Sequence, residues 1–283
     1  MALKTRSKDT PSSGLPSKVV VHVAADAMAF DKAALLRDLK SAATKLPVPE
    51  VRGDLAAGLG GRTLQYKVAG LRVRDSKVPD EYLHASSTDA EFEAGVDMRG
   101  SPVSWVHLLS RLYDGNAVAQ AALEAVPEGE RDRGTLHVWV TRRLLATYDP
   151  GDMRYHARFA VFGYPTVFSV LGLALAPAAS REATLFSYEL AKRGASAADI
   201  EAQLDKEFPE ERIDVDDKTT VTSALGTAVL QAAARDAGQG PFCDDPKCRL
   251  TNAHRKREVL TTMIGGRLCA AHAKLFGSGG RGG

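Results

Sequence analysis

All three cysteines of the chain lie in one segment near its C-terminal end. Cys243 and Cys248 are separated by four residues, Cys269 and His272 by two, and twenty residues lie between the two pairs. We call the two ligand pairs, residues 243–248 and 269–272, the first and second hook. Two such hooks joined by a longer connection are the usual layout of a structural zinc site, because each hook presents two donors to one edge of a tetrahedron. Thiolate and imidazole ligands also favour zinc over calcium or magnesium. We therefore predict that these four side chains bind one zinc ion.

The residues between the ligands suit the tight turns that such hooks need. Residues 244–246 (Asp-Asp-Pro) can turn the chain between the first two thiols, and Gly265-Gly266 allows it to fold sharply before Cys269. Four protein ligands complete the coordination of the ion, whereas a hydrolytic zinc keeps one position open for water. We therefore expect the ion to stabilise structure and not to perform a reaction.

His254 is an alternative fourth ligand, because it lies six residues after Cys248. Its neighbours Arg255, Lys256 and Arg257 are typical of a solvated basic surface, which favours His272 as the ligand instead.

Composition indicates an ordinary soluble globular protein. The chain has 283 residues, of which 44% are hydrophobic and 25% charged, enough to bury a large core in one or two domains. Its 37 basic and 35 acidic residues nearly balance, so the net charge indicates no class of partner. An odd number of clustered cysteines argues against a disulfide framework and favours a reducing compartment. The N-terminal segment lacks the apolar core of a signal peptide, so we expect a cytoplasmic location.

One apolar stretch approaches the length that crosses a membrane. Residues 159–180 carry no charge, but Gly163-Tyr164-Pro165 interrupts them, and their Phe and Val content favours buried strands. We predict two core strands here and no membrane contact.

The remaining periodicity mixes strands and helices. Short-period, β-branched runs predict strands at residues 18–26, around Val51, at 64–73 and at 135–140. Apolar faces and capping residues predict helices at residues 31–46, 101–113, 116–126, 183–208 and 219–237, with Ser101 and Asn116 as caps of the second and third.

This mixture predicts an α/β or α+β fold built on a mixed sheet with flanking helices. We expect one domain over residues 18–276, whose zinc-binding segment is residues 240–276, and disordered tails at residues 1–17 and 277–283, which are rich in Gly, Ser, Pro and charge.

The cysteine segment resembles the archaemetzincins, metalloproteases with the signature HExxHxxGxxHC-x4-C-x-M followed by C-x2-C. Here "FCDDPKCRL" takes the place of "HC-x4-C-x-M", and "CAAH" replaces the closing "C-x2-C". The same segment, together with "RYHARFAVFGYPTVFSVLGLALAPAASRE", is similar to an uncharacterised, largely archaeal family classed as metallopeptidases; this likeness covers roughly residues 48–272. The resemblance implies a metzincin-like domain, with the cysteines holding a structural zinc.

The catalytic half of that signature is missing. In the register set by Cys243, Phe242 stands for the third histidine, Asp236 for the second, and Ala232 and Ala233 for the first histidine and the general-base glutamate. Leu250 takes the place of the methionine under the catalytic metal. None of these side chains can hold and activate a zinc-bound water, and no HExxH occurs elsewhere.

Other motifs are weaker. The polar run Arg154–Arg158, with a tyrosine and a histidine between arginines, could bind an anion or a carbonyl group, but a satisfied polar network at a strand start is the more common explanation. Residues 58–62 are glycine-rich without a phosphate-binding lysine, and Ser169 has no GxSxG context.

Two classes of function follow. The first is a zinc-binding, archaemetzincin-like pseudoenzyme that binds or scaffolds, with its degenerate cleft accepting a peptide or protein ligand. The second is a nucleic-acid-binding protein, because residues 247–274 hold seven Lys or Arg against one acid, although few aromatic residues accompany them. A metal-dependent hydrolase with a relocated active site is a third, less favoured alternative.

Overall fold

The computed structural model describes residues 14–24, 30–55, 62–84 and 111–278. Its larger sheet has five strands in the order β2-β1-β4-β8-β7: β2 (Glu50–Arg52), β1 (Lys18–Val23), β4 (Thr135–Thr141), β8 (Thr166–Ser169) and β7 (Ala160–Val161). All neighbours are parallel except β7, which pairs antiparallel with β8 at the edge. Every residue of β4 is buried, as expected for a central parallel strand covered on both faces.

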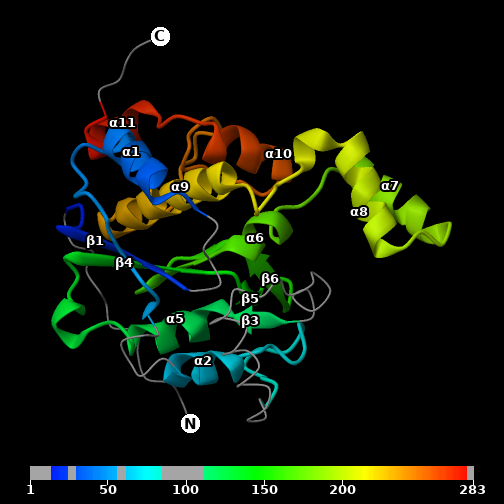
Figure 1. Ribbon diagram of the computed structural model, residues 1–283, viewed down its shortest axis with the longest axis horizontal. Coiled ribbons are helices and arrows are strands. Elements are labelled where there is room, and N and C mark those ends of the chain that lie inside the picture. The colour runs from blue at the N-terminus through cyan, green and yellow to red at the C-terminus, as the bar shows by residue number, and fades with distance from the viewer. Residues whose placement is uncertain (1–13, 25–29, 56–61, 85–110, 279–283) are drawn as a thin grey trace.

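Helices cover both faces of this sheet (Figure 1). On one face, α9 (Lys218–Asp236) lies between the sheet and α1 (Lys32–Ala42), while α5 (Gly115–Leu123) and α2 (Arg62–Ala69) lie on the other. Residues 224–234 of α9 are all buried, because the helix is enclosed by the sheet on one side and by α1 and the C-terminal segment on the other. The Asp217 side chain caps α9 by accepting the N–H groups of Thr219 and Thr220.

A second, three-stranded sheet adjoins α5. Its order is β3 (Leu112–Asp114), β5 (Leu144–Asp149) and β6 (Arg154–Arg158), with β5 and β6 antiparallel. One Asp114 carboxylate oxygen caps α5 by accepting two backbone N–H groups, and the other accepts the hydroxyls of Tyr82 and Tyr155. This fully paired carboxylate fixes the sheet to the start of α5.

The remaining elements form an arm and a C-terminal cover. Helix α6 (Val170–Leu175) follows β8, and α7 (Arg181–Lys192) with α8 (Ala197–Glu207) forms a hairpin that projects from the body (Figure 1). The short helices η3 (Glu128–Glu130) and η4 (Pro209–Glu211) are connectors. The chain ends with α10 (Lys256–Glu258), the π-helical turn η5 (Val259–Ile264) and α11 (Ala270–Phe276); η5 contacts α9, and residues 276–277 contact the end of α1.

The expected α+β class, with a mixed sheet and flanking helices, is confirmed. The strands around residues 18–26, 51 and 135–140 and the helices at 31–46 and 219–237 are present with shifted ends, although residues 25–29 lie outside the described part. The helical region 183–208 is present as two helices, α7 and α8, separated by residues 193–196. Residues 1–13 and 279–283 of the predicted tails, residues 56–61 of the glycine-rich motif, and residues 101–110 of a predicted helix also lie outside it.

Three local predictions were wrong. The expected strand at 64–73 is mostly helix α2, because its buried residues come in two adjacent pairs four positions apart (Leu64, Gln65, Val68 and Ala69), a pattern that shares one face of a helix but not of a strand. Residues 112–114 continue as β3 and not as helix, and Asp114, two residues before the predicted Asn116, caps α5. The second of the two strands expected in residues 159–180 ends at Ser169, whose hydroxyl accepts the Gly172 N–H and starts α6.

No helix in the described part of the chain is long and apolar enough to span a bilayer.

Candidate metal centre

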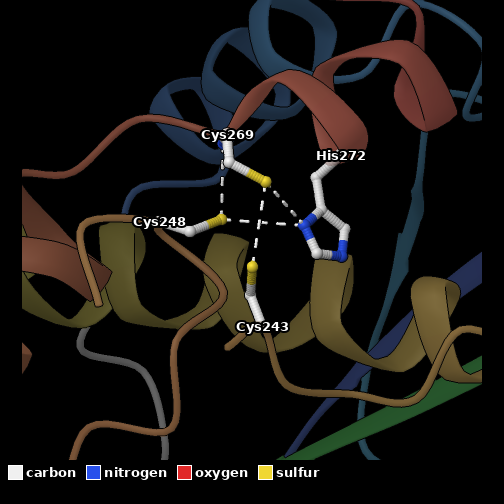
Figure 2. Close-up of side chains that lie close together, drawn as sticks. All are labelled: Cys243, Cys248, Cys269 and His272. Atoms are coloured by element: carbon white, nitrogen blue, oxygen red, sulfur yellow. Dashed lines mark hydrogen bonds between the residues drawn. The ribbon is translucent and has the colours of Figure 1, made fainter. Parts of the chain in front are cut away.

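The four side chains predicted as ligands point at one another (Figure 2). The Cys243 Sγ atom lies 3.7 Å from Cys269 Sγ, and His272 Nδ1 lies 3.7 Å from Cys248 Sγ and 3.2 Å from Cys269 Sγ. All four ligand atoms are within 4.8 Å of one another, and the three cysteines are free thiols. The group could therefore hold a metal ion.

The spacing fits a tetrahedral ion. A zinc bound at about 2.3 Å to sulfur and about 2.0 Å to nitrogen separates two tetrahedral sulfurs by about 3.8 Å and a sulfur from a nitrogen by about 3.5 Å. The distances of 3.7, 3.7 and 3.2 Å are close to these values. They are also far longer than a disulfide bond of about 2.05 Å. The donors are thus arranged for a shared ion and not for a cross-link.

The first hook is shaped by backbone hydrogen bonds. The Cys248 N–H donates to the Asp245 carbonyl at 3.0 Å, and the Asp245 carboxylate accepts the Lys247 N–H at 2.9 Å, which closes the turn between the two thiols. The Cys243 N–H donates to the Leu250 carbonyl at 2.9 Å. The predicted turn after Cys243 is therefore present, and it brings both sulfurs to the same side of the loop.

The second hook is the start of a helix. Cys269 is the residue that precedes α11, and His272 follows one turn later, so the two side chains lie on the same face. Before them, the Gly266 N–H donates to the Thr262 carbonyl, and a Cβ at Gly266 would lie only 2.1 Å from that oxygen. The sharp fold predicted at the glycine pair is thus one that a side chain would obstruct.

Burial and backbone donors set the protonation of the ligands. Burial raises the pKa of Cys243 to about 12 and also raises the pKa of Cys248. Burial alone would raise the pKa of Cys269 as well, but backbone N–H groups of α11 and the neighbouring thiols bring it below its usual value. Burial lowers the pKa of His272, which keeps the imidazole neutral and able to bind a metal at neutral pH. Metal binding must therefore displace thiol protons.

Two backbone N–H groups point at one sulfur. The amides of Leu250 and Cys269 each lie 3.4 Å from Cys248 Sγ, within the longer range of hydrogen bonds to sulfur. Because these donors come from both hooks, they stabilise a thiolate at Cys248 and join the hooks to each other.

An ion pair between a buried arginine and a partly exposed aspartate anchors the segment to the body. Arg249 directly follows Cys248, is only 6% exposed, and donates to both carboxylate oxygens of Asp38 on α1 at 2.9 and 2.5 Å. It also donates to the Thr227 hydroxyl and the Ser223 carbonyl of α9. The first hook is thereby fixed against both α1 and α9.

Two further contacts join the segment to α9. The Thr227 hydroxyl donates to the Met263 carbonyl at 2.6 Å, and the Gln231 amide approaches the Leu250 carbonyl at 3.4 Å. Sequence reasoning missed these anchors and placed Arg249 on a basic surface. No local signal distinguishes a buried arginine from an exposed one here, because its partner Asp38 lies 211 positions away.

His254, the alternative ligand, lies outside the cluster. Its side chain is exposed, its carbonyl accepts the Ala178 N–H, and its own N–H donates to the Glu258 carboxylate. The structure thus brings together the His272 set and not the His254 set.

The positions that the sequence resemblance would match to an archaemetzincin active site are buried or make other contacts. Ala232 and Ala233 are 0% exposed inside the core, and Leu250 is equally buried. Asp236 pairs with the adjacent Arg235 at 2.6 Å, and Phe242, 38% exposed, packs edge-to-face on Phe162.

A second group lies at the end of the β5–β6 hairpin. Within the described ranges, Asp149, Asp152 and His156 are the only other cluster of His, Cys, Asp or Glu close enough to share a metal. However, Asp152 accepts from Arg154 Nε at 2.8 Å and lies 2.7 Å from His156 Nε2, and Asp149 accepts the Gly151 N–H. The interaction with His156, followed by that with Arg154, lowers the pKa of Asp152. These contacts describe a surface ion-pair network, as expected for the run Arg154–Arg158.

The basic surface is partly neutralised. Of the seven cations counted in residues 247–274, Arg249 is buried against Asp38, and Arg257 pairs with Glu210 at 2.9 Å. Arg255 and Lys256 share a hollow with Glu182 and Glu211. The surface charge that faces solvent is therefore less positive than the count of seven basic residues against one acidic residue suggests.

The comparisons with known proteins give one positive finding. A family model described as a probable metallopeptidase family (DUF6775) matches residues 15–278. Neither the curated proteins nor the solved structures contain a match. Because the family model covers nearly the whole chain, the protein belongs to this family.

Proposed function

We propose that this family member is an archaemetzincin-like, non-catalytic binding protein in which one structural zinc ion is held by Cys243, Cys248, Cys269 and His272. The observation that carries the proposal is the Cys₃His cluster itself. Its four donor atoms lie within 4.8 Å of one another, and an ion bound to all four would have complete tetrahedral coordination with no position for water or substrate. An ion there organises the C-terminal segment and has no open position from which to polarise a peptide bond.

The residues at the positions of the archaemetzincin zinc ligands and general base also support a non-catalytic role. In the archaemetzincin register, the first histidine and the glutamate correspond to alanines that are fully enclosed in α9. The third histidine corresponds to a phenylalanine whose ring packs on Phe162. No rotation of these side chains can supply a ligand or a general base, because alanine and phenylalanine carry no donor atom.

The archaemetzincin likeness is supported by the order of elements. A long helix, α9, leads through a short loop into the C-x4-C hook, and a closing hook follows after a helical turn. The helix that would carry HExxH in an archaemetzincin is thus retained as a core element. We propose a cytoplasmic location, because three reduced thiols are needed for zinc binding.

Metal analysis together with a peptidase assay tests the proposal. The purified full chain should contain one zinc, and a mixture of unfolded proteins incubated with it should stay intact. Cys269→Ser should lose the zinc, whereas His254→Ala, a matched change in the same segment outside the cluster, should retain it. A second tightly held zinc, or cleavage that disappears with zinc chelation, would contradict a non-catalytic role and favour a relocated hydrolytic centre.

A further inference from the structure

A groove of about 450 Å³ lies between the sheet edge and the zinc segment. One wall comes from the end of β6 and from β7, including Arg158, Phe159 and Val161. The other comes from the zinc segment, with Phe242 directly before the first ligand and residues 252–254 between the two hooks. The groove thus lies where these two parts of the chain meet, and Asn116, Thr147, Ala176 and Pro177 complete its lining.

The charge of the groove is one-sided. No aspartate or glutamate is among its lining residues, whereas Arg158 and His254 are. The Arg158 Nε donates to the Thr147 hydroxyl at 2.9 Å, which fixes the guanidinium. Its two terminal nitrogens have no partner within the described part of the chain. A held guanidinium with free donors is suited to bind a carboxylate through two parallel hydrogen bonds.

Aromatic rings stand next to this cation. Phe159, Phe162 and Phe242 line the same groove, and the last two meet edge-to-face with centroids 5.5 Å apart. Phe242 is among the large apolar side chains that remain exposed in the described residues. A few polar groups beside apolar walls are typical of sites that orient a ligand by one end and bury the other.

An extended chain suits this location. β7 is the last strand of the five-stranded sheet, and both of its residues line the groove. An edge strand has an unpaired side on which a peptide main chain can pair with backbone N–H and C=O groups, although the Val161 carbonyl already accepts the Gly163 N–H at 3.1 Å. Asn116 and Asn252 add side-chain amides that can both donate and accept.

We propose that this groove binds the free C-terminal end of a peptide whose last residues are apolar, with Arg158 on the terminal carboxylate and the phenylalanine rings on the last side chains. This deepens the proposed function, on which it rests, by naming the ligand class. Because residues 242 and 252–254 form one wall, binding depends on the zinc that holds their segment.

Fluorescence anisotropy with two labelled six-residue peptides ending in Leu-Phe, one with a free carboxylate and one with a terminal amide, tests the inference on the zinc-loaded full chain. The acid should bind about tenfold more tightly than the amide, as expected for charge-assisted hydrogen bonds. Arg158→Gln should lower the affinity for the free-acid peptide to that for the amide peptide. Arg158→Lys should retain part of the preference for the free acid. Arg154→Gln, a matched control on the same strand outside the groove, should bind like the wild type.

Equal binding of acid and amide, or binding of neither by a folded chain with one zinc, would overturn the inference and leave the proposed function standing. Mass spectrometry of the peptides after the titration separates the two proposals. Cleaved peptide would contradict the non-catalytic role, even if the acid is preferred. Melting temperature and zinc content of each variant confirm that a loss of binding is not a loss of fold.

Discussion

Two groups in the described part of the chain could hold a metal, and they differ in three physical respects. In the Cys₃His cluster, His272 and Cys248 are buried, backbone amides point at sulfur, and Arg249 fixes one hook to α1 and α9. The Asp149–Asp152–His156 group lies at a hairpin end, where Arg154 already occupies one carboxylate. Proximity of ligand atoms is common to both. Burial, soft donors and anchoring are found only in the first, and they favour metal binding by the cysteine cluster over the surface ion-pair network.

The largest expected effect comes from removing one sulfur. Cys269→Ser should lose the zinc and lower the free energy of unfolding by about 4 kcal/mol or more, because metal affinity is coupled to folding. Calorimetry of the variant and the wild type, both purified and measured with zinc in the buffer, tests this. If the variant lacks zinc but melts at the wild-type temperature, the ion does not stabilise the fold.

Loss of the ion pair between Arg249 and Asp38 should destabilise the fold almost as much as loss of a zinc ligand. Asp38→Ala leaves the buried Arg249 guanidinium without its carboxylate and should cost about 3 kcal/mol. Asp38→Ala combined with Arg249→Met removes both charges and should recover part of the loss. Chemical denaturation with zinc present checks both variants; equal destabilisation by the single and double changes would mean that the pair is not the anchor.

A pair of buried histidines outside both of these groups provides a test of acid sensitivity that does not depend on zinc. His22 Nε2 lies 3.0 Å from His137 Nδ1 inside the five-stranded sheet. Burial, followed by the charge of His137, lowers the pKa of His22 to about 4. The unfolded chain, with a histidine pKa near 6.5, therefore binds more protons than the folded chain between pH 6.5 and 4. The free energy of unfolding should therefore be highest above pH 6.5 and should fall by about 2–3 kcal/mol as the pH drops from 6.5 to 4.

This acid effect is separable from zinc loss. His22→Gln should reduce the pH dependence of denaturation between pH 6.5 and 4 without abolishing it, because burial also lowers the pKa of His137 and of His272, while the zinc content at pH 7 stays at one per chain. An unchanged slope in the variant would show that another group causes the acid sensitivity.

The smallest effect should come from the surface group. Asp152→Asn removes the carboxylate shared by Arg154 and His156 but should leave zinc content and melting temperature at wild-type values, because exposed ion pairs contribute little. A drop in metal content would instead make this group a second metal site.

The site was more predictable from sequence than the fold around it. The C-x4-C and C-x2-H spacings identify the four clustered residues, because ligand pairs on short hooks are local features. The helix α9 was also predictable from its apolar periodicity. By contrast, Leu64 and Val68 fit a strand or a helix in a short window, and α2 was misassigned.

Long-range partners could not be predicted. Arg249 lies among basic neighbours in sequence, and only the packing of α1 on α9 brings Asp38 to it. The groove likewise joins residues near position 158 to residues near 242 and 254. Such pairings depend on the topology, which local patterns do not encode.

X-ray absorption at the zinc edge of the purified full chain tests the central claim most directly. We predict one zinc per chain, coordinated by three sulfurs at about 2.3 Å and one nitrogen at about 2.0 Å. An oxygen ligand from water, or fewer than three sulfurs, would contradict a closed site and reopen the question of catalysis at this ion.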